Sequence, residues 1–281
     1  MILSVVVITH NEEVNIARAL ASAQPLVADG KGEIIVVDSG STDRTVKIAK
    51  SFGAKVFIEE WKGYAAQKNS AIEKAEGEWI LSLDADEEVG AGMREFLLLA
   101  LFGRHQEEFA DFQGGMIFAR RNCFLGRPMR HGGFYPDPKL RLIRRGCARF
   151  EDRLVHEDFR LNRGVEYKPS LHYEMGSPIE IIHHSYPTLA DYIDHMNRYS
   201  SLGAEMAVAQ GPRGFSVFNI VLRPIATFTY NYFLRLGFLD GREGLLLHLY
   251  HAVYVSWKYA KAWELSRSRE SRQKPRLHLG N

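Results

Sequence analysis

The first hundred residues alternate short apolar runs, rich in β-branched side chains, with longer stretches of helical periodicity. Short apolar runs are typical of buried strands, and apolar positions three and four residues apart are typical of helices that cover a sheet. The pattern predicts strands at 3–9, 33–38, 55–58 and 79–83, with helices at 13–23, 42–52 and 64–75. This alternation predicts an α/β protein with a mostly parallel sheet flanked by helices.

The remainder of the chain changes character twice. Residues 114–173 mix strand-like runs, at 115–119 and 140–143, with Gly, Pro and Arg, which indicates an irregular extension of the sheet. From Thr188 the pattern becomes helical, with apolar stretches at 189–208, 215–238 and 245–263. We therefore expect a sheet domain over residues 1–187 and a helical extension with a basic tail over residues 188–281.

Three of the predicted parallel strands end in polar clusters, at residues 9–12, 38–43 and 84–87. The carboxyl ends of parallel strands meet at one edge of the sheet, where α/β proteins bind ligands. Asp84 and Asp86 suit a hard cation such as Mg²⁺ or Mn²⁺, with room left for diphosphate oxygens. The alternative interpretation is a pair of solvated acids or a helix cap.

Two further residues near this edge have chemistry that suits a nucleotide. Asp38 ends a strand, where its carboxylate can accept a hydrogen bond from a base N–H or a ribose hydroxyl, and Lys68 can neutralise phosphate. The alternative for Asp38 is ordinary turn chemistry, and the alternative for Lys68 is a solvated position on a helix surface. For Asp43 we favour the turn role.

Composition and charge narrow the class of protein. Hydrophobic residues make up 46% and charged residues 25% of the chain, as in ordinary globular proteins. The formal net charge of +2 gives no argument for nucleic acid as a partner. The two cysteines, Cys123 and Cys147, have no metal-ligand spacing, and this favours a reducing compartment.

The chain resembles the inverting family 2 glycosyltransferases, which have the Rossmann-like GT-A fold, in four motifs that occur in the same order and spacing. These motifs are Thr9-His10-Asn11-Glu12, Val37 to Asp43, Gln67-Lys68-Asn69 and Leu83-Asp84-Ala85-Asp86. The resemblance implies a UDP-sugar donor whose diphosphate is held by Mg²⁺ or Mn²⁺. The residues to which it assigns donor or metal binding are Thr9, Asn11, Glu12, Asp38, Lys68, Asp84 and Asp86, with Asp86 as the more direct metal ligand.

Later motifs are similar to the bacterial lipopolysaccharide-core β-1,4-glucosyltransferases. They lie at residues 139–145, 154–157, 183–186 and 197–200. This resemblance implies transfer of a hexose, with glucose as the first candidate, to a glycan or glycolipid acceptor. An inverting transfer needs a general base, which family members often place in a Glu-Asp pair. Both 151–152 and 157–158 are such pairs, and we favour Glu157 with Asp152 as the second candidate.

Three histidines are candidates for a further metal ligand or an acceptor contact: His131, His156 and His183. A hydrogen-bonded structural role is the alternative for each of them. Two other functions also stay open. A polyprenyl-phosphate sugar synthase has an acceptor that is already anionic, so it needs no strong base, and a catalytically silent nucleotide-binding protein would lack transfer altogether.

The helical end has features of a membrane surface binder. Residues 258–281 contain seven Lys or Arg against two Glu, and the apolar stretches before them are rich in aromatic residues and interrupted by Arg223 and Arg235. No uninterrupted apolar run reaches about 18 residues, the length that a membrane-spanning helix needs. We expect a cytoplasmic protein bound peripherally to the inner face of the cytoplasmic membrane. Packing on the core or a dimer interface is the alternative.

Overall fold

The computed structural model describes residues 1–104, 106–110, 112–151, 159–169 and 177–273. The chain forms two compact units, which are described separately below. Unit 1 comprises residues 1–123 and 135–185, and unit 2 comprises residues 124–134 and 186–281. The sheet and its covering helices therefore lie in unit 1, whereas unit 2 combines a short excursion from the middle of the chain with the C-terminal helices.

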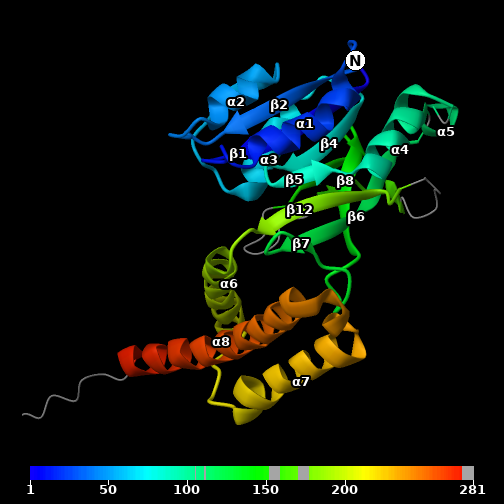
Figure 1. Ribbon diagram of the computed structural model, residues 1–281. Coiled ribbons are helices and arrows are strands. Elements are labelled where there is room, and N and C mark those ends of the chain that lie inside the picture. The colour runs from blue at the N-terminus through cyan, green and yellow to red at the C-terminus, as the bar shows by residue number, and fades with distance from the viewer. Residues whose placement is uncertain (105, 111, 152–158, 170–176, 274–281) are drawn as a thin grey trace, which may run out of the picture. The chain divides into compact units, whose positions relative to one another are not determined.

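Unit 1 is built on a mixed sheet with the strand order β3-β2-β1-β4-β8-β6-β12-β5 (Figure 1). Its strands are β1 Leu3–Thr9, β2 Gly32–Asp38, β3 Lys55–Ile58, β4 Trp79–Asp84, β5 Glu87–Val89, β6 Gly114–Phe124, β8 Asp137–Arg144, β11 Glu166–Pro169 and β12 Glu180–Tyr186. The first four run parallel, as predicted, while β8 returns antiparallel to β4 and β6 antiparallel to β8.

Helices cover both faces of this sheet, which confirms the predicted fold class. They are α1 Ile16–Val27, α2 Thr45–Ser51, α3 Tyr64–Glu73, α4 Ala91–Phe102 and α5 Gln106–Ala110. Side chains alternate along each strand, so β1 supplies both cores. Val5 and Val7 pack with α1 and α4 in one cluster, and Val6 packs with α3 in the other. A hairpin of β9 Ala148–Phe150 and β10 Phe159–Leu161 adds to the second cluster.

The register of the strands determines where the polar clusters lie along the edge of the sheet. Thr9 pairs with Asp38 across β1 and β2, and Ile8 pairs with Asp84 across β1 and β4. All three strands therefore end together at one edge of the sheet, as the sequence predicts. The loops that follow β1, β2 and β4 have to meet there.

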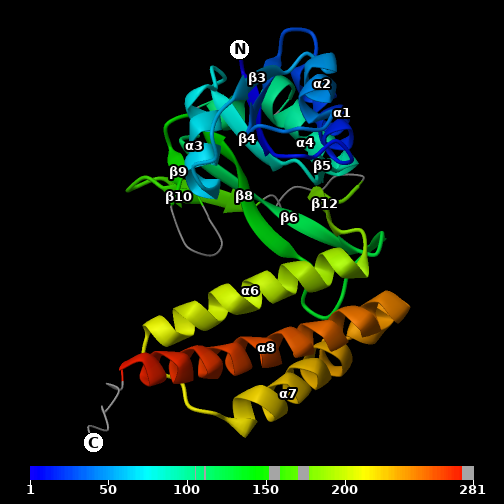
Figure 2. The same cartoon turned by 90° about the vertical axis from the view of Figure 1, so that its left-hand side faces the viewer.

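Unit 2 consists mainly of helices, with α6 and α7 packed on the long helix α8 (Figure 2). Its elements are β7 Arg127–Pro128, α6 Leu189–Ala209, the π-helical turns η2 Phe218–Leu222 and η3 Tyr230–Leu234, α7 Arg223–Thr229, the 3-10 turn η4 Gly237–Asp240, and α8 Gly241–Gln273. A capping box at Thr188 and Asp191 begins α6. Within the described residues, no helix is both long and apolar enough to cross a membrane.

Residues 124–134 belong with these helices because their side chains complete the helical core. Phe124 and Met129 are buried against Tyr192 of α6 and Leu247 of α8. The carboxylate of Asp240 fixes the end of the same segment, since it accepts hydrogen bonds from the backbone N–H groups of Arg130 and His131. Local periodicity gives no indication of this long-range docking.

Candidate active site

The loops after β1 and β2 are joined through the buried carboxylate of Asp38. Its Oδ1 accepts from the backbone N–H groups of Gly40 and Ser41 at 3.0 and 2.8 Å. Its Oδ2 accepts from the hydroxyls of Thr9 and Ser41 at 2.8 and 2.5 Å. Four partners fill the usual capacity of a carboxylate, so a ligand N–H or hydroxyl would have to replace one of them. Asp38 shapes this edge of the sheet, and its direct contact with a nucleotide stays a prediction.

Asn11 and Asp43 connect the same two loops further out. Asn11 has a φ of 55°, a left-handed conformation that Asn tolerates better than most residues. Its backbone N–H donates to the Ser41 hydroxyl, and its Oδ1 accepts from the backbone N–H of Thr42 at 2.9 Å. Asp43 accepts from the backbone N–H and hydroxyl of Thr45 at the start of α2, which confirms the turn role that we favoured for it. The two loops form one rigid rim.

Glu12 lies on this rim close to the acidic residues of the β4 loop. Its backbone N–H donates to the Thr45 hydroxyl, and its carboxylate accepts from the Asn15 side chain at 2.9 Å. Burial raises the pKa of Glu12, and the nearby carboxylates of Asp86, Asp43 and Asp84 raise it further. Acidic groups are therefore concentrated here, as they are where a protein holds a cation.

Asp84 already has its counter-charges within the protein. Its Oδ1 lies 2.8 Å from Nζ of Lys68, and its Oδ2 lies 2.7 Å from Nη2 of Arg141. Burial opposes ionisation of this carboxyl, but the two cations outweigh burial and hold the pKa of Asp84 well below its ordinary value. In this structure Lys68, buried on α3, is thus engaged with Asp84.

Arg141 is part of a buried charge network that sequence analysis did not predict. The same Nη2 lies 2.5 Å from the fully buried Glu87, which also meets Arg120 at 3.2 Å. Asp137 accepts from Arg120 in turn at 2.6 Å. A charged residue inside the apolar run of β8 was the available indication, since an arginine there needs a buried acid.

Asp86 has a different partner, His183 of β12. Oδ2 of Asp86 lies 3.2 Å from Nε2 of His183, and within the described residues Asp86 has no Lys or Arg partner. Burial raises the pKa of Asp86, but His183 outweighs it and the net shift is downward. The backbone N–H of His184 donates to the Asp86 carbonyl at 3.0 Å and fixes the β4 loop to β12.

The second ring nitrogen of His183 determines what Nε2 presents to Asp86. Nδ1 lies 2.7 Å from Oδ1 of Asn122 and 3.1 Å from the Ser185 hydroxyl. An amide oxygen only accepts, so the contact with Asn122 is a hydrogen bond in the tautomer whose proton is on Nδ1. In the neutral ring of that tautomer the Nε2 lone pair faces the Asp86 carboxylate, and a positive charge between the two groups favours the contact. A proton or a metal ion supplies that charge, and second-sphere amides commonly orient metal-binding histidines in this way.

Three of the predicted residues, Asp152, His156 and Glu157, fall within 152–158, outside the described residues. His131 lies in unit 2, where its Nδ1 is 2.8 Å from Oδ1 of Asp240 and its backbone N–H donates to the same carboxylate. Within the described residues no cluster of three or more His, Cys, Asp or Glu side chains is arranged to hold a metal ion.

Known proteins similar to this chain agree with the motifs. The model of the family "Glycosyl transferase family 2" matches residues 4–149. An uncharacterised glycosyltransferase of Rickettsia typhi is 31% identical over 94% of this chain and 87% of the relative. The lipopolysaccharide core biosynthesis glycosyltransferase LpsC of Rhizobium meliloti is 30% identical over 93% of this chain and 92% of that protein. A solved structure of S. aureus TarS is 16% identical, with a TM-score of 0.43, over 98% of this chain and 93% of TarS. The chain is a GT-A glycosyltransferase and belongs to glycosyl transferase family 2.

Proposed function

We propose that the protein is a metal-dependent inverting glycosyltransferase that moves a hexose, with glucose as the first candidate, from a UDP-sugar to a glycan or lipopolysaccharide-core acceptor. The observation that carries the proposal is the pair Asp86 and His183 at the carboxyl edge of the parallel strands. Similarity to LpsC along nearly its whole length supports the acceptor class.

The residues of the β4 loop fit a divalent cation. Asp86 and Nε2 of His183 would hold Mg²⁺ or Mn²⁺, since a carboxylate oxygen and an oriented imidazole are ligands that both ions accept. Asp84 keeps Lys68 and Arg141, so it contributes charge balance to the site. When bound, the ion neutralises the charge of the leaving diphosphate.

The rim formed by the β1 and β2 loops supports the donor half of the proposal. Thr9 and Asp38 fix the loop backbone, Asn11 joins the two loops, and Glu12 of the rim lies near the acidic residues of the β4 loop. Ligands of α/β proteins bind at such an edge, in the crevice outside the carboxyl ends of the strands. We infer that Lys68, beside Asp84, stabilises the diphosphate or reaches the base.

Transfer itself requires a base on the acceptor side. The acceptor hydroxyl gives its proton to a carboxylate while its oxygen attacks the anomeric carbon, and the bond from that carbon to the diphosphate breaks on the opposite face. Its electron pair leaves with UDP. We assign the base to Glu157, with Asp152 as the second candidate, because of the motifs around them.

A single set of variants tests the donor and acceptor halves. A thermal-shift panel of UDP-, GDP-, CMP- and dTDP-sugars, with and without Mn²⁺, should show a shift of the wild type only for uridine compounds with metal. The variant Asp86→Asn should lose both this metal-dependent thermal shift and the release of UDP from the donor, because a ligand of the ion is removed. Asp29→Asn is the matched control, because this exposed carboxylate lies in a turn far from Asp86 in the sequence. A metal-dependent shift retained by Asp86→Asn contradicts the proposed site.

Glu157→Gln addresses the base in the same assay. The variant should keep the donor-dependent thermal shift while transfer falls by about 10²–10⁴-fold, the usual cost of a lost general base. Unchanged transfer to a polyprenyl phosphate would instead favour the synthase of lipid-linked sugars. Absence of transfer and of donor hydrolysis in the wild type would favour a silent nucleotide-binding protein.

We also propose that unit 2 attaches the protein peripherally to the inner face of the cytoplasmic membrane. Exposed apolar side chains are concentrated between residues 215 and 249, among them Phe218, Leu234 and Leu239. The basic residues near the C-terminus add attraction to an anionic leaflet. The enzyme and a membrane-bound acceptor would then meet on the same membrane surface.

A further inference from the structure

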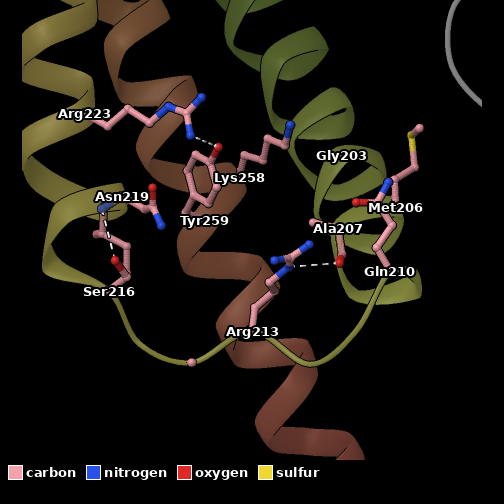
Figure 3. A pocket seen from close by; sticks show the side chains of 12 residues that line it. Gly203, Met206, Ala207, Gln210, Arg213, Ser216, Asn219, Arg223, Lys258 and Tyr259 are labelled. Atoms are coloured by element: carbon pink, nitrogen blue, oxygen red, sulfur yellow. Dashed lines mark hydrogen bonds between the residues drawn. The ribbon is translucent and has the colours of Figure 1, made fainter.

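Unit 2 contains a cavity of about 390 Å³ between α6, α8 and the segment that precedes α7 (Figure 3). Its polar lining is basic and neutral, without a single Asp or Glu. Three cations come from separate parts of the chain: Arg213 from the loop after α6, Arg223 from the first turn of α7, and Lys258 from α8. A volume of this size suits a small ligand or a headgroup.

The three cations have no carboxylate partner within the described residues. Arg213 uses its Nε to donate to the carbonyl of Ala207 at 3.1 Å, and Arg223 donates to the hydroxyl of Tyr259 at 2.5 Å (Figure 3). These neutral acceptors orient the guanidinium groups but leave their charge unbalanced. Lys258 packs its stem against Gly203 of α6, where an added Cβ would lie 3.2 Å from the lysine chain. Arg213 and Arg223 are exposed, and guanidinium groups form their strongest hydrogen bonds with anions such as phosphate.

The segment next to the pocket exposes apolar side chains to the surroundings. Between residues 217 and 225, Asn219, Ile220 and Arg223 line the pocket, whereas Phe218 and Leu222 are 63% and 53% exposed. The exposed apolar side chains distinguish this segment from a helix of a water-soluble protein, whose apolar side faces the core. An exposed apolar surface of this kind is typical of interaction with a membrane or a partner.

The charge of the segment distinguishes between those partners. The sequence has no Asp or Glu between Glu205 and Asp240, but it has Arg213, Arg223 and Arg235 there. A second copy of the chain in a symmetric interface would bring the same cations together, and like charges oppose association. An anionic bilayer offers apolar chains and negative phosphates within a few ångströms of each other, which matches both features.

We propose that the pocket around Arg213, Arg223 and Lys258 binds the phosphate of an anionic phospholipid headgroup, while residues 215–239 lie in the bilayer interface. Arginine and lysine together suit this ligand, since guanidinium groups bind phosphate oxygens in pairs and an ammonium adds a compact charge. This site deepens the proposed membrane attachment and is independent of the transferase reaction.

Vesicle sedimentation with the full-length protein tests the site. The wild type should bind vesicles of phosphatidylcholine and phosphatidylglycerol, and bind phosphatidylcholine alone much more weakly. Arg223→Gln and Lys258→Gln should each reduce partitioning onto the anionic vesicles by about fivefold, the factor expected for one cation at an anionic surface. The matched control is Lys47→Gln, which removes the same charge as Lys258→Gln from an exposed position of α2 in unit 1. Its partitioning should fall by less than about twofold, because this lysine belongs neither to the pocket nor to the basic residues near the C-terminus.

Equal losses for Lys47→Gln and Lys258→Gln would overturn the pocket, because the effect would then be general electrostatic attraction. Equal binding of the wild type to both kinds of vesicle would also overturn it, although membrane attachment would stand. Binding to neither would overturn both. Inorganic phosphate and glycerol 3-phosphate form the soluble arm. If they raise the melting temperature of the wild type but not of Lys258→Gln, and the wild type does not sediment with vesicles, the lipid source is wrong.

Discussion

Asp84, at the end of β4 in unit 1, has two cationic side chains beside it, whereas the cations of the pocket in unit 2 have only neutral partners in the described structure. Asp84 lies between Lys68 and Arg141. Arg213 and Arg223 instead meet a backbone carbonyl and a phenol. We infer that the charges around Asp84 support the fold, whereas those of the pocket serve to bind a ligand. Asp86 follows the second pattern with the opposite sign, since only a histidine accompanies it.

Removal of Arg141 should have the largest effect on stability. The side chain is 6% exposed and serves both Asp84 and the fully buried Glu87. Arg141→Met would leave the buried Glu87 and the partly buried Asp84 without their shared cation, which should lower the free energy of unfolding by about 3–5 kcal/mol. Urea denaturation followed by circular dichroism measures the loss.

A matched arginine on the surface provides the control for this prediction. Arg160 pairs with Glu151 at 2.6 Å and is 72% exposed, so Arg160→Gln should cost no more than about 1 kcal/mol. If the two arginine variants lose the same stability, the sheet does not depend on an internal counter-charge. The inference that the cations beside Asp84 support the fold of unit 1 would then be wrong.

Much of the parallel half of the sheet could be predicted from the sequence. The bounds of β1 and β3 match the expected runs, and the meeting of Thr9, Asp38 and Asp84 at one edge follows from parallel order alone. These features depend on local periodicity and on a general rule of α/β sheets. The same reasoning brought Asp86 into the site.

The partners of those carboxylates could not be predicted in the same way. Arg141, Asn122 and His183 come from β8, β6 and β12, which join the sheet antiparallel and far along the chain from β4. Which of their residues faces Asp84 or Asp86 depends on register, and a shift of one residue would reverse every side chain. Sequence motifs named His183 as a candidate, but only the folded sheet brings Asn122 to its Nδ1.

Glu59 extends the comparison to a carboxylate near the surface, where an intermediate effect is expected. It accepts from Lys74 at 2.5 Å, from Ser70 at 2.7 Å and from Lys62 at 3.0 Å. Hydrogen bonds from these groups, with Lys74 first, lower the pKa of Glu59 to about 2 from 4.5. A lowered pKa in the folded state adds stability above pH 4.5, and that stability is lost as the pH falls toward 2.

Glu59→Gln should therefore cost about 0.5–1 kcal/mol near neutral pH, after solvent screening is taken into account, and clearly less near pH 3. Urea melts of the wild type and the variant at the two pH values give the difference directly. An equal cost at both would mean that the carboxylate contributes by shape and not by charge.

The smallest change in stability should come from the substitution of Lys258. No carboxylate of the described residues pairs with its ammonium group, and Arg213 and Arg223 line the same cavity. Lys258→Gln should thus alter the free energy of unfolding by less than about 0.5 kcal/mol in buffer without phosphate. Lys68→Gln is the counterpart in unit 1, where the loss of a buried partner of Asp84 should cost about 1–3 kcal/mol. Equal costs for the two lysines would show that Lys258 supports the helices of unit 2. A cost confined to Lys68 would mean that Lys258 is dispensable for folding, as expected of a residue that binds a ligand.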